Sequence, residues 1–154
     1  MSADKPSRRD FAIGIATTAA ALSLPTEAVL AQDQAQAWEL AVRKIMGEAK
    51  PAEGKFSIEL PEIAENGNTV PFSVSVESPM TEKDHVKAIH VIATANPQPG
   101  VATFRLTPLS GKAAVSSRMR LARTQDVIGI AELSDGRFLM IKRPVKVTIG
   151  GCGG

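Results

Sequence analysis

Residues 70–77 read Val-Pro-Phe-Ser-Val-Ser-Val-Glu, so that apolar side chains alternate with small or charged ones. A period of two places every second side chain on the same face of an extended segment, which predicts a β-strand with one buried face. Asn66-Gly67 just before it is a turn signal. Residues 56–60 alternate in the same way on the other side of that turn. We therefore expect two strands joined through residues 61–69.

The same kind of pattern continues toward the C-terminus. Further strands are predicted at 86–94, 101–107, 113–121, 127–133 and, after the Asp135-Gly136 turn, 137–149. Seven short strands at this spacing predict an all-β, immunoglobulin-like antiparallel β-sandwich over 51–149, with a β-barrel as the structural alternative. Pro71 and Pro144 fall inside strand patterns, which confines those positions to sheet edges or bulges.

Residues 32–50 have a different period. Trp38, Val42, Ile45 and Met46 recur at spacings of three and four, which predicts an N-terminal helix that Asp33 caps. The residue before a proline is biased out of helical geometry, so with Pro51 following we expect the helix to end near Ala49.

Composition excludes several classes of protein. The chain has 154 residues, one Cys and a formal net charge of +2. This length indicates one domain. A single Cys excludes an internal disulfide framework and any Cys-cluster metal or iron–sulfur site. The small net charge gives no general reason to expect nucleic acid as a partner.

The charge is unevenly distributed. Residues 32–104 carry six Lys/Arg against ten Asp/Glu, whereas residues 105–154 carry nine against three. One interpretation is solvated strand faces. The other is a field that attracts anions or an acidic partner toward the C-terminal end. The candidate residues for that role are Arg118, Arg120, Arg123, Lys142 and Lys146.

The body of the chain shows no constellation typical of catalysis. His85 falls next to a charged loop, His90 lies inside a predicted strand, and there is no third histidine. Two such residues are fewer than the three protein ligands usual for a metal. Ser, Thr and carboxylates are scattered without a nucleophile elbow or a phosphate loop. We therefore expect no catalytic residue, no metal site and no cofactor, and we interpret the body as a scaffold.

Residues 1–31 predict a signal peptide. Ser7-Arg8-Arg9-Asp10-Phe11 precedes an uncharged apolar run at 12–24, too short to span a bilayer as a helix but typical of a signal-peptide core. Small residues predict cleavage after Ala31. The paired arginines resemble a twin-arginine export signal, although Ala12 and Ile13 replace its more usual Leu and Lys. The predicted location is the bacterial periplasm, with no membrane anchor.

The C-terminal tail carries the chemistry. The chain ends Gly150-Gly151-Cys152-Gly153-Gly154, beyond the last residue that a sheet would hold, Ile149. Glycines give backbone freedom, and five residues reach roughly 17 Å. A free thiol forms and breaks S–S bonds, so we interpret the tail as a flexible arm that presents Cys152. The alternative, a frayed terminus with an incidental Cys, leaves an unpaired thiol in an oxidising compartment without a reason.

This tail, with the paired-arginine signal, closely resembles the SoxY family, the sulfur-compound carriers of bacterial thiosulfate oxidation. All five tail residues agree with the family motif. The resemblance implies that substrate attaches covalently to the Cys152 sulfur. It also implies that Gly150, Gly151, Gly153 and Gly154 form the arm, and that the chain is a carrier rather than an enzyme.

The resemblance also implies partners. The family pairs with SoxZ, a second immunoglobulin-like subunit without an export signal of its own. A c-type haem enzyme joins thiosulfate to the cysteine oxidatively, giving Cys–S–S–SO₃⁻, and a dimanganese hydrolase releases sulfate and leaves a persulfide. A molybdenum–haem sulfane dehydrogenase oxidises the remaining sulfur, and a second hydrolysis regenerates the thiol. The haems, manganese and molybdenum belong to these partners.

Two other functions are compatible with parts of the sequence. A ubiquitin-like sulfur carrier or modifier would use ATP to activate the carboxylate of Gly154, but the export signal and the all-β pattern argue against it. A non-catalytic β-sandwich binding module would bind a partner through a sheet edge, and deletion of residues 150–154 would then have no effect.

Overall fold

The computed structural model describes residues 37–150. Among these residues it contains a helix at 37–46, eight strands and one short 3₁₀ turn. The strands are β1 (Phe56–Glu59), β2 (Ile63–Ala64), β3 (Val70–Val76), β4 (Val86–Ala93), β5 (Gly100–Arg105), β6 (Ala113–Met119), β7 (Gln125–Leu133) and β8 (Phe138–Val147), and the turn is η1 (Pro108–Ser110).

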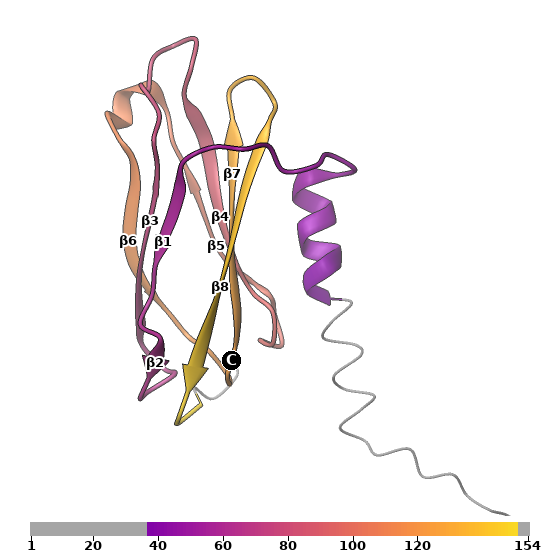
Figure 1. The fold of residues 1–154 in the computed structure, drawn as a ribbon, viewed down its shortest axis with the longest axis vertical. Coiled ribbons are helices and arrows are strands. Elements are labelled where there is room, and N and C mark those ends of the chain that lie inside the picture. The colour runs from indigo at the N-terminus through magenta and orange to yellow at the C-terminus, as the bar shows by residue number, and fades with distance from the viewer. Residues whose placement is uncertain (1–36, 151–154) are drawn as a thin grey trace, which may run out of the picture.

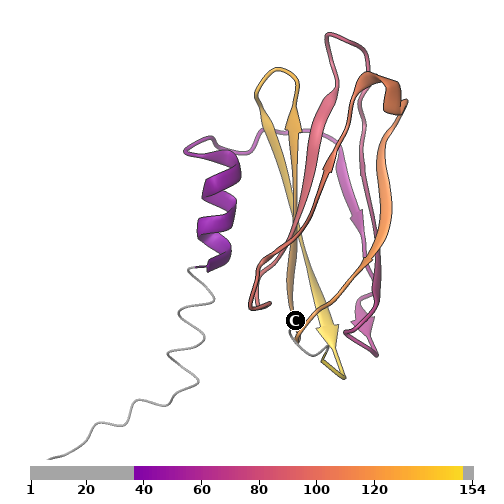
Figure 2. The same cartoon turned by 180° about the vertical axis from the view of Figure 1, so that it is seen from behind.

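The strands form two layers (Figures 1 and 2). One sheet has the order β1-β3-β6, and the other has the order β2-β8-β7-β4-β5. All pairs are antiparallel except the short pair β2–β8, in which Ile63 lies beside Lys146 and Ala64 beside Val147. The predicted sandwich is confirmed, and the barrel alternative is wrong because the two sheets remain separate. Among residues 37–150, no helix has the length and apolar content needed to cross a membrane.

The main core lies between the two sheets. It is built from the alternating apolar positions that predicted the strands, with Phe72 and Val74 of β3 facing Val91 of β4 and Val127 of β7 within one buried cluster. Gly129 of β7 is needed because it has no side chain. A Cβ there would lie 2.8 Å from the Phe56 ring, so the absent side chain leaves room for Phe56 of β1 to pack across the layers.

A helix covers the outer face of the five-stranded sheet (Figures 1 and 2). Its described residues are 37–46. Met46 is buried against Ile92, Ile128 and Ile130, with Trp38, Ala41, Val42, Ile45 and Phe138 packed around them. The predicted helical face is therefore confirmed, while Asp33 lies outside the described residues. The predicted end near Ala49 is wrong by three residues, because Gly47 adopts a left-handed φ of +61° and stops the helix.

The two prolines lie at locally open edges. Pro71 pairs with Arg118 on one side, whereas β1 pairs with β3 only from Ser73 onward. Pro144 pairs with Asp126 on one side, whereas β2 pairs with β8 only beyond it. A residue without an N–H is tolerated in both places because no neighbouring strand is present to accept from it. Strand β2 itself was not predicted, since two residues are too short to show a period.

Candidate functional site: the arm root

The predicted attachment residue lies just beyond the described chain. Gly151, Cys152, Gly153 and Gly154 are outside the described residues, and Gly150 is the last residue described. The structure therefore shows where the tail begins. We call residues 146–150, with the segments that hold them, the arm root. It lies at the end of the sandwich opposite the β7–β8 hairpin (Figure 1).

The segment that follows β2 holds one side of the arm root. The Thr148 N–H donates to the Ala64 carbonyl at 3.1 Å, and the Thr148 hydroxyl donates to the Glu65 carbonyl at 3.0 Å. The Gly67 N–H donates to the Ile149 carbonyl at 2.7 Å. Hydrogen bonds therefore continue for two residues past the end of β8, so the chain direction is fixed up to Ile149.

The loop between β6 and β7 holds the other side. The Val147 N–H donates to Thr124 Oγ1 at 2.9 Å, and the Thr124 hydroxyl donates to the Val147 carbonyl at 3.3 Å. Gly150 then passes so close to Ala122 that a Cβ on it would overlap the Ala122 carbonyl oxygen. The sequence assigned Gly150 to the arm for its backbone freedom. The structure adds a steric demand for glycine at this position.

A network of polar side chains around the buried Gln125 fixes that loop in turn. Gln125 is the buried polar side chain of the described core, at 7% exposure. Its Nε2 donates to Asn96 Oδ1 at 2.9 Å and to the Arg123 carbonyl at 3.0 Å, and its Oε1 accepts from the Ala95 N–H at 2.7 Å. Asn96 also accepts from the Ala122 N–H and donates to the Arg120 carbonyl, both at 2.9 Å.

The sequence did not predict this network. Asn96-Pro97 marks a turn, but nothing in the neighbourhood of Gln125 indicates that its amide is buried. Its position depends on the register of β7 against β8, where Gln125 lies beside Val145.

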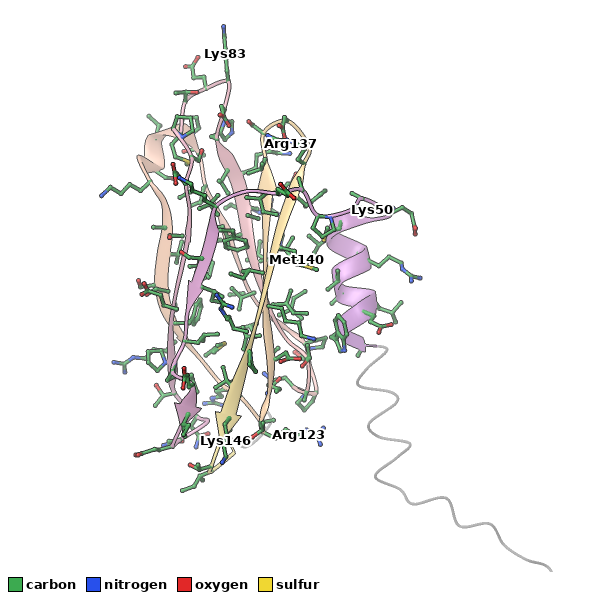
Figure 3. All side chains as sticks on the ribbon, viewed as in Figure 1. Lys50, Lys83, Arg123, Arg137, Met140 and Lys146 are labelled. Carbon is green, nitrogen blue, oxygen red and sulfur yellow. The ribbon has the colours of Figure 1, made fainter. Side chains whose placement is uncertain are left out.

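Several basic side chains lie near the arm root. Arg120, Arg123, Arg143 and Lys146 are all exposed, and Figure 3 places Arg123 and Lys146 at the end where the chain leaves the sandwich. A cleft of about 790 Å³ opens beside them between β1 and β8. Its lining residues are Ile58, Glu59, Leu60, Glu62, Thr124, Arg143, Pro144, Val145 and Lys146.

The two histidines lie apart from the arm root. His85 precedes β4, and its Nδ1 lies 3.0 Å from the Thr81 carbonyl. His90 lies within β4, where Nδ1 contacts Thr103 Oγ1 at 3.0 Å and Nε2 is buried without a hydrogen-bond partner. Burial lowers the pKa of His90, because the charged ring would lose solvation. Among residues 37–150, no group of three or more His, Cys, Asp or Glu is positioned to hold a metal ion.

Comparison with known proteins gives a family match and a fold match. Residues 42–152 match the family model described as sulfur oxidation protein SoxY, so the matched span reaches Cys152. The solved structure of the sulfur carrier protein SoxY from Chlorobium limicola f thiosulfatophilum is similar to this chain. It has 34% identity and a TM-score of 0.61, and the match covers 75% of this chain and 99% of that one. No curated protein matches significantly by sequence.

Superoxide reductases have a similar fold. A variant of the superoxide reductase (neelaredoxin) from Ignicoccus hospitalis matches at 15% identity and a TM-score of 0.56, covering 71% of this chain and 86% of that one. A putative superoxide reductase from Thermotoga maritima matches at 18% identity and a TM-score of 0.55, covering 64% of this chain and 93% of that one. At such identity the likeness concerns the sandwich alone.

Proposed function

The chain belongs to the SoxY family and has a carrier role in sulfur oxidation, and on that premise we propose that it is a periplasmic carrier that holds thiosulfate-derived sulfur on the Cys152 sulfur. The observation that carries the proposal is the arm root. The final strand is fixed by hydrogen bonds up to Ile149, and the family match extends from there through Cys152. Cys152 follows Ile149 by three residues, and we infer that the scaffold presents its thiol to partner proteins.

The chemistry proposed for Cys152 begins with an oxidation. Thiosulfate condenses with the thiol to give Cys–S–S–SO₃⁻ and one proton, and two electrons pass to the haems of a c-type haem partner. The S–S bond forms between the Cys152 sulfur and the outer sulfur of thiosulfate. The body supplies no catalytic group to this step, so the thiol is activated by the enzyme that receives it.

Hydrolysis follows on a second partner. Water attacks the sulfonate sulfur and breaks the S–SO₃ bond, releasing sulfate and one proton and leaving Cys–S–SH. This is the reaction of the dimanganese hydrolase that the family resemblance implies. The sulfane dehydrogenase would then accept six electrons from the outer sulfur while three water molecules supply its oxygens, which gives Cys–S–SO₃⁻ and seven protons. A second hydrolysis of the S–SO₃ bond would release sulfate and one proton and return the carrier as a thiol.

The role of Cys152 is tested by removing the thiol and by moving it. In a reconstituted system we expect Cys152→Ser to abolish thiosulfate-dependent electron transfer while thermal unfolding is unchanged. A double variant, Cys152→Ser with Leu109→Cys, restores a thiol on η1, where Leu109 is 98% exposed. It should also be inactive, because η1 lies at the other end of the sandwich (Figure 1). Electron transfer by the Cys152→Ser carrier would contradict the proposal.

Intact mass measurement tests the same proposal in the cell. Protein recovered from the periplasm of thiosulfate-grown cells should carry a sulfur-containing adduct on its C-terminal peptide. Its mass should correspond to a chain that begins at Gln32. Substituting Arg8 and Arg9 by Lys should leave the precursor uncleaved in the cytoplasm. Recovery of an uncleaved chain from the periplasm, or of an adduct elsewhere, would argue against the proposed route or the proposed site.

A SoxZ-like subunit is the proposed structural partner. Co-expression of the two chains should yield a heterodimer that survives purification, and the folded pair would cross the membrane on the one signal peptide. Purification of this chain alone, from cells that express both, would contradict that part of the proposal.

A further inference from the structure

The position of the arm root limits how far Cys152 extends from the body. Hydrogen bonds and the Ala122 contact locate the chain as far as Gly150. Cys152 follows by two residues, and an extended chain spans at most ~3.6 Å per residue, so its Cα lies within about 7 Å of the Gly150 Cα. Any enzyme pocket that receives the sulfur must therefore bring its rim against the surface around Gly150.

Basic side chains outnumber acidic ones on that surface by three to two. Arg120 and Arg123 lie on either side of Ala122, whose carbonyl approaches Gly150, and Lys146 lies four residues before Gly150 on β8. We call these three residues the arm-end rim, and all three are exposed. Glu62 and Glu65 are the acidic residues on the adjoining segment. In the described chain neither Glu62 nor Glu65 forms an ion pair, and Arg120 and Lys146 form none either.

Another lysine of β8, Lys142, has a structural role and can be compared with the rim. Lys142 forms an ion pair with Asp126 at 2.8 Å and lies 5.8 Å from the centroid of the Trp38 ring. It therefore connects the helix to the sheet. The arm-end rim has no comparable contact for Arg120 or Lys146 within the described residues, so their charge remains available to an approaching molecule.

We propose that the arm-end rim docks on an acidic protein surface that borders the substrate pockets of the enzymes that process Cys152. The inference rests on the proposed carrier function. Surface charges attract a macromolecule of opposite sign over several ångströms and raise its association rate. A small anion such as thiosulfate would instead need converging donors in a concave site. Arg120 and Lys146 are exposed side chains on separate segments, which favours a protein surface.

The test is a charge reversal with a matched control. The rim variant carries Arg120→Glu and Lys146→Glu. The control carries Lys83→Glu and Lys112→Glu, which change the net charge equally but lie on the 78–85 loop and next to η1, at the end away from the arm (Figures 1 and 3). The purified c-type haem partner, thiosulfate and each carrier are mixed, and the second-order rate constant for conjugation is measured at several ionic strengths.

We expect the rim variant to react about tenfold more slowly at ~10 mM ionic strength, and to approach the wild type near 1 M, because the Debye length falls from about 30 Å to about 3 Å. The control should stay within about twofold of the wild type. Alkylation of Cys152 by an uncharged maleimide should be equal in all three, which shows that the thiol itself is unchanged. If the glutamates impair folding, a milder variant that carries Arg120→Gln and Lys146→Gln replaces the charge reversal. Because it only removes the two charges, it should give a rate between those of the wild type and the rim variant.

The possible outcomes separate the two proposals. If the wild type is not conjugated at all, the carrier function fails. If the wild type is conjugated and the rim variant reacts equally fast at low salt, the docking surface is wrong. The docking surface would also be wrong if the rim variant raised the KM for thiosulfate and left the KM for the carrier unchanged. The rim would then bind the small anion rather than a protein surface.

Discussion

Two regions, one on β8 and one where β8 ends and the tail begins, use basic and apolar residues in opposite ways. At the helix-covered face, Lys142 is held by Asp126 and Trp38, and the apolar side chains beneath the helix are buried. At the arm root, the backbone is fixed by hydrogen bonds from both sides, while Lys146 and Ile149 stay exposed. One region contributes stability through its side chains. The other fixes a direction through its backbone and leaves its side chains to solvent.

The difference separates what holds the fold from what presents the tail. Burial of apolar area is the main favourable term in folding, so the helix face should contribute more to the free energy of unfolding than the arm root does. The arm root buries little, so changes there should alter the position of the tail more than the stability. If the two regions are independent, each can be changed without affecting the other.

The largest effect on stability is expected for Ile130→Ala. Ile130 has 0% exposure beneath the helix, and truncating such a side chain costs about 2–5 kcal/mol. Urea unfolding, followed through the single Trp, Trp38, measures the loss. The conjugation rate per folded molecule should equal that of the wild type. A slower rate in fully folded protein would show that the helix face and the arm root are coupled.

A smaller loss, accompanied by a change at the arm root, is expected for Gln125→Leu. The substitution leaves the Ala95 N–H and the Arg123 carbonyl without the amide, which costs about 1–3 kcal/mol. Because the same loop contacts Gly150, conjugation should slow as well. Gln98→Leu, an exposed glutamine in the neighbouring turn, is the matched control and should change stability by less than about 0.5 kcal/mol. An unchanged conjugation rate in Gln125→Leu would show that the loop does not position the tail.

Gly150→Ala tests the steric demand at the arm root directly. The added Cβ would displace the chain from Ala122 and weaken the Gly67–Ile149 hydrogen bond, with an expected loss of about 0.5–1.5 kcal/mol. Hydrogen exchange of the Gly67 amide should accelerate. Gly100→Ala is the control, since a Cβ there meets nothing within 4 Å. Equal protection of Gly67 in both variants would mean that Gly150 serves only for backbone freedom.

The sequence predicted most of the fold, because alternating side chains report the buried face of each strand. All seven predicted strands are present, and none of their ends is shifted by more than two residues. The apolar run at 127–131 also fits a strand buried on both faces, since Val127 faces the other sheet while Ile128 and Ile130 face the helix. The sequence did not predict the features that have no hydrophobic period. These are the two-residue strand β2 and the pairing of the segment after it with residues 148–149.

The sequence pointed to the tail, whose chemistry stays a prediction, but not to the segments that hold the arm root. Gly150 and its neighbours were recognisable because the sequence places a lone Cys between glycines and also carries a segment that resembles an export signal. Asn96, Thr124 and Gln125 were not, because their roles depend on side chains meeting across loops far apart in sequence. Of the five basic candidates, Lys142 contacts the helix face. The sequence does not distinguish the role of Lys142 from that of Lys146, because the difference depends on which elements pack against each.

The smallest effect, and the most direct comparison of the two regions, is expected from Lys142→Ala and Lys146→Ala. Half-exposed ion pairs contribute about 0–1 kcal/mol, and a cation–π contact near the surface contributes about 0.5–1 kcal/mol. Lys142→Ala should therefore lower the free energy of unfolding by up to about 1 kcal/mol and shift the emission of Trp38. Lys146→Ala removes the same side chain from the same strand but should leave both unchanged, and it should slow conjugation at low ionic strength only. If both variants changed Trp38 emission, or neither changed conjugation, the division of β8 into a structural half and a presenting half would be wrong.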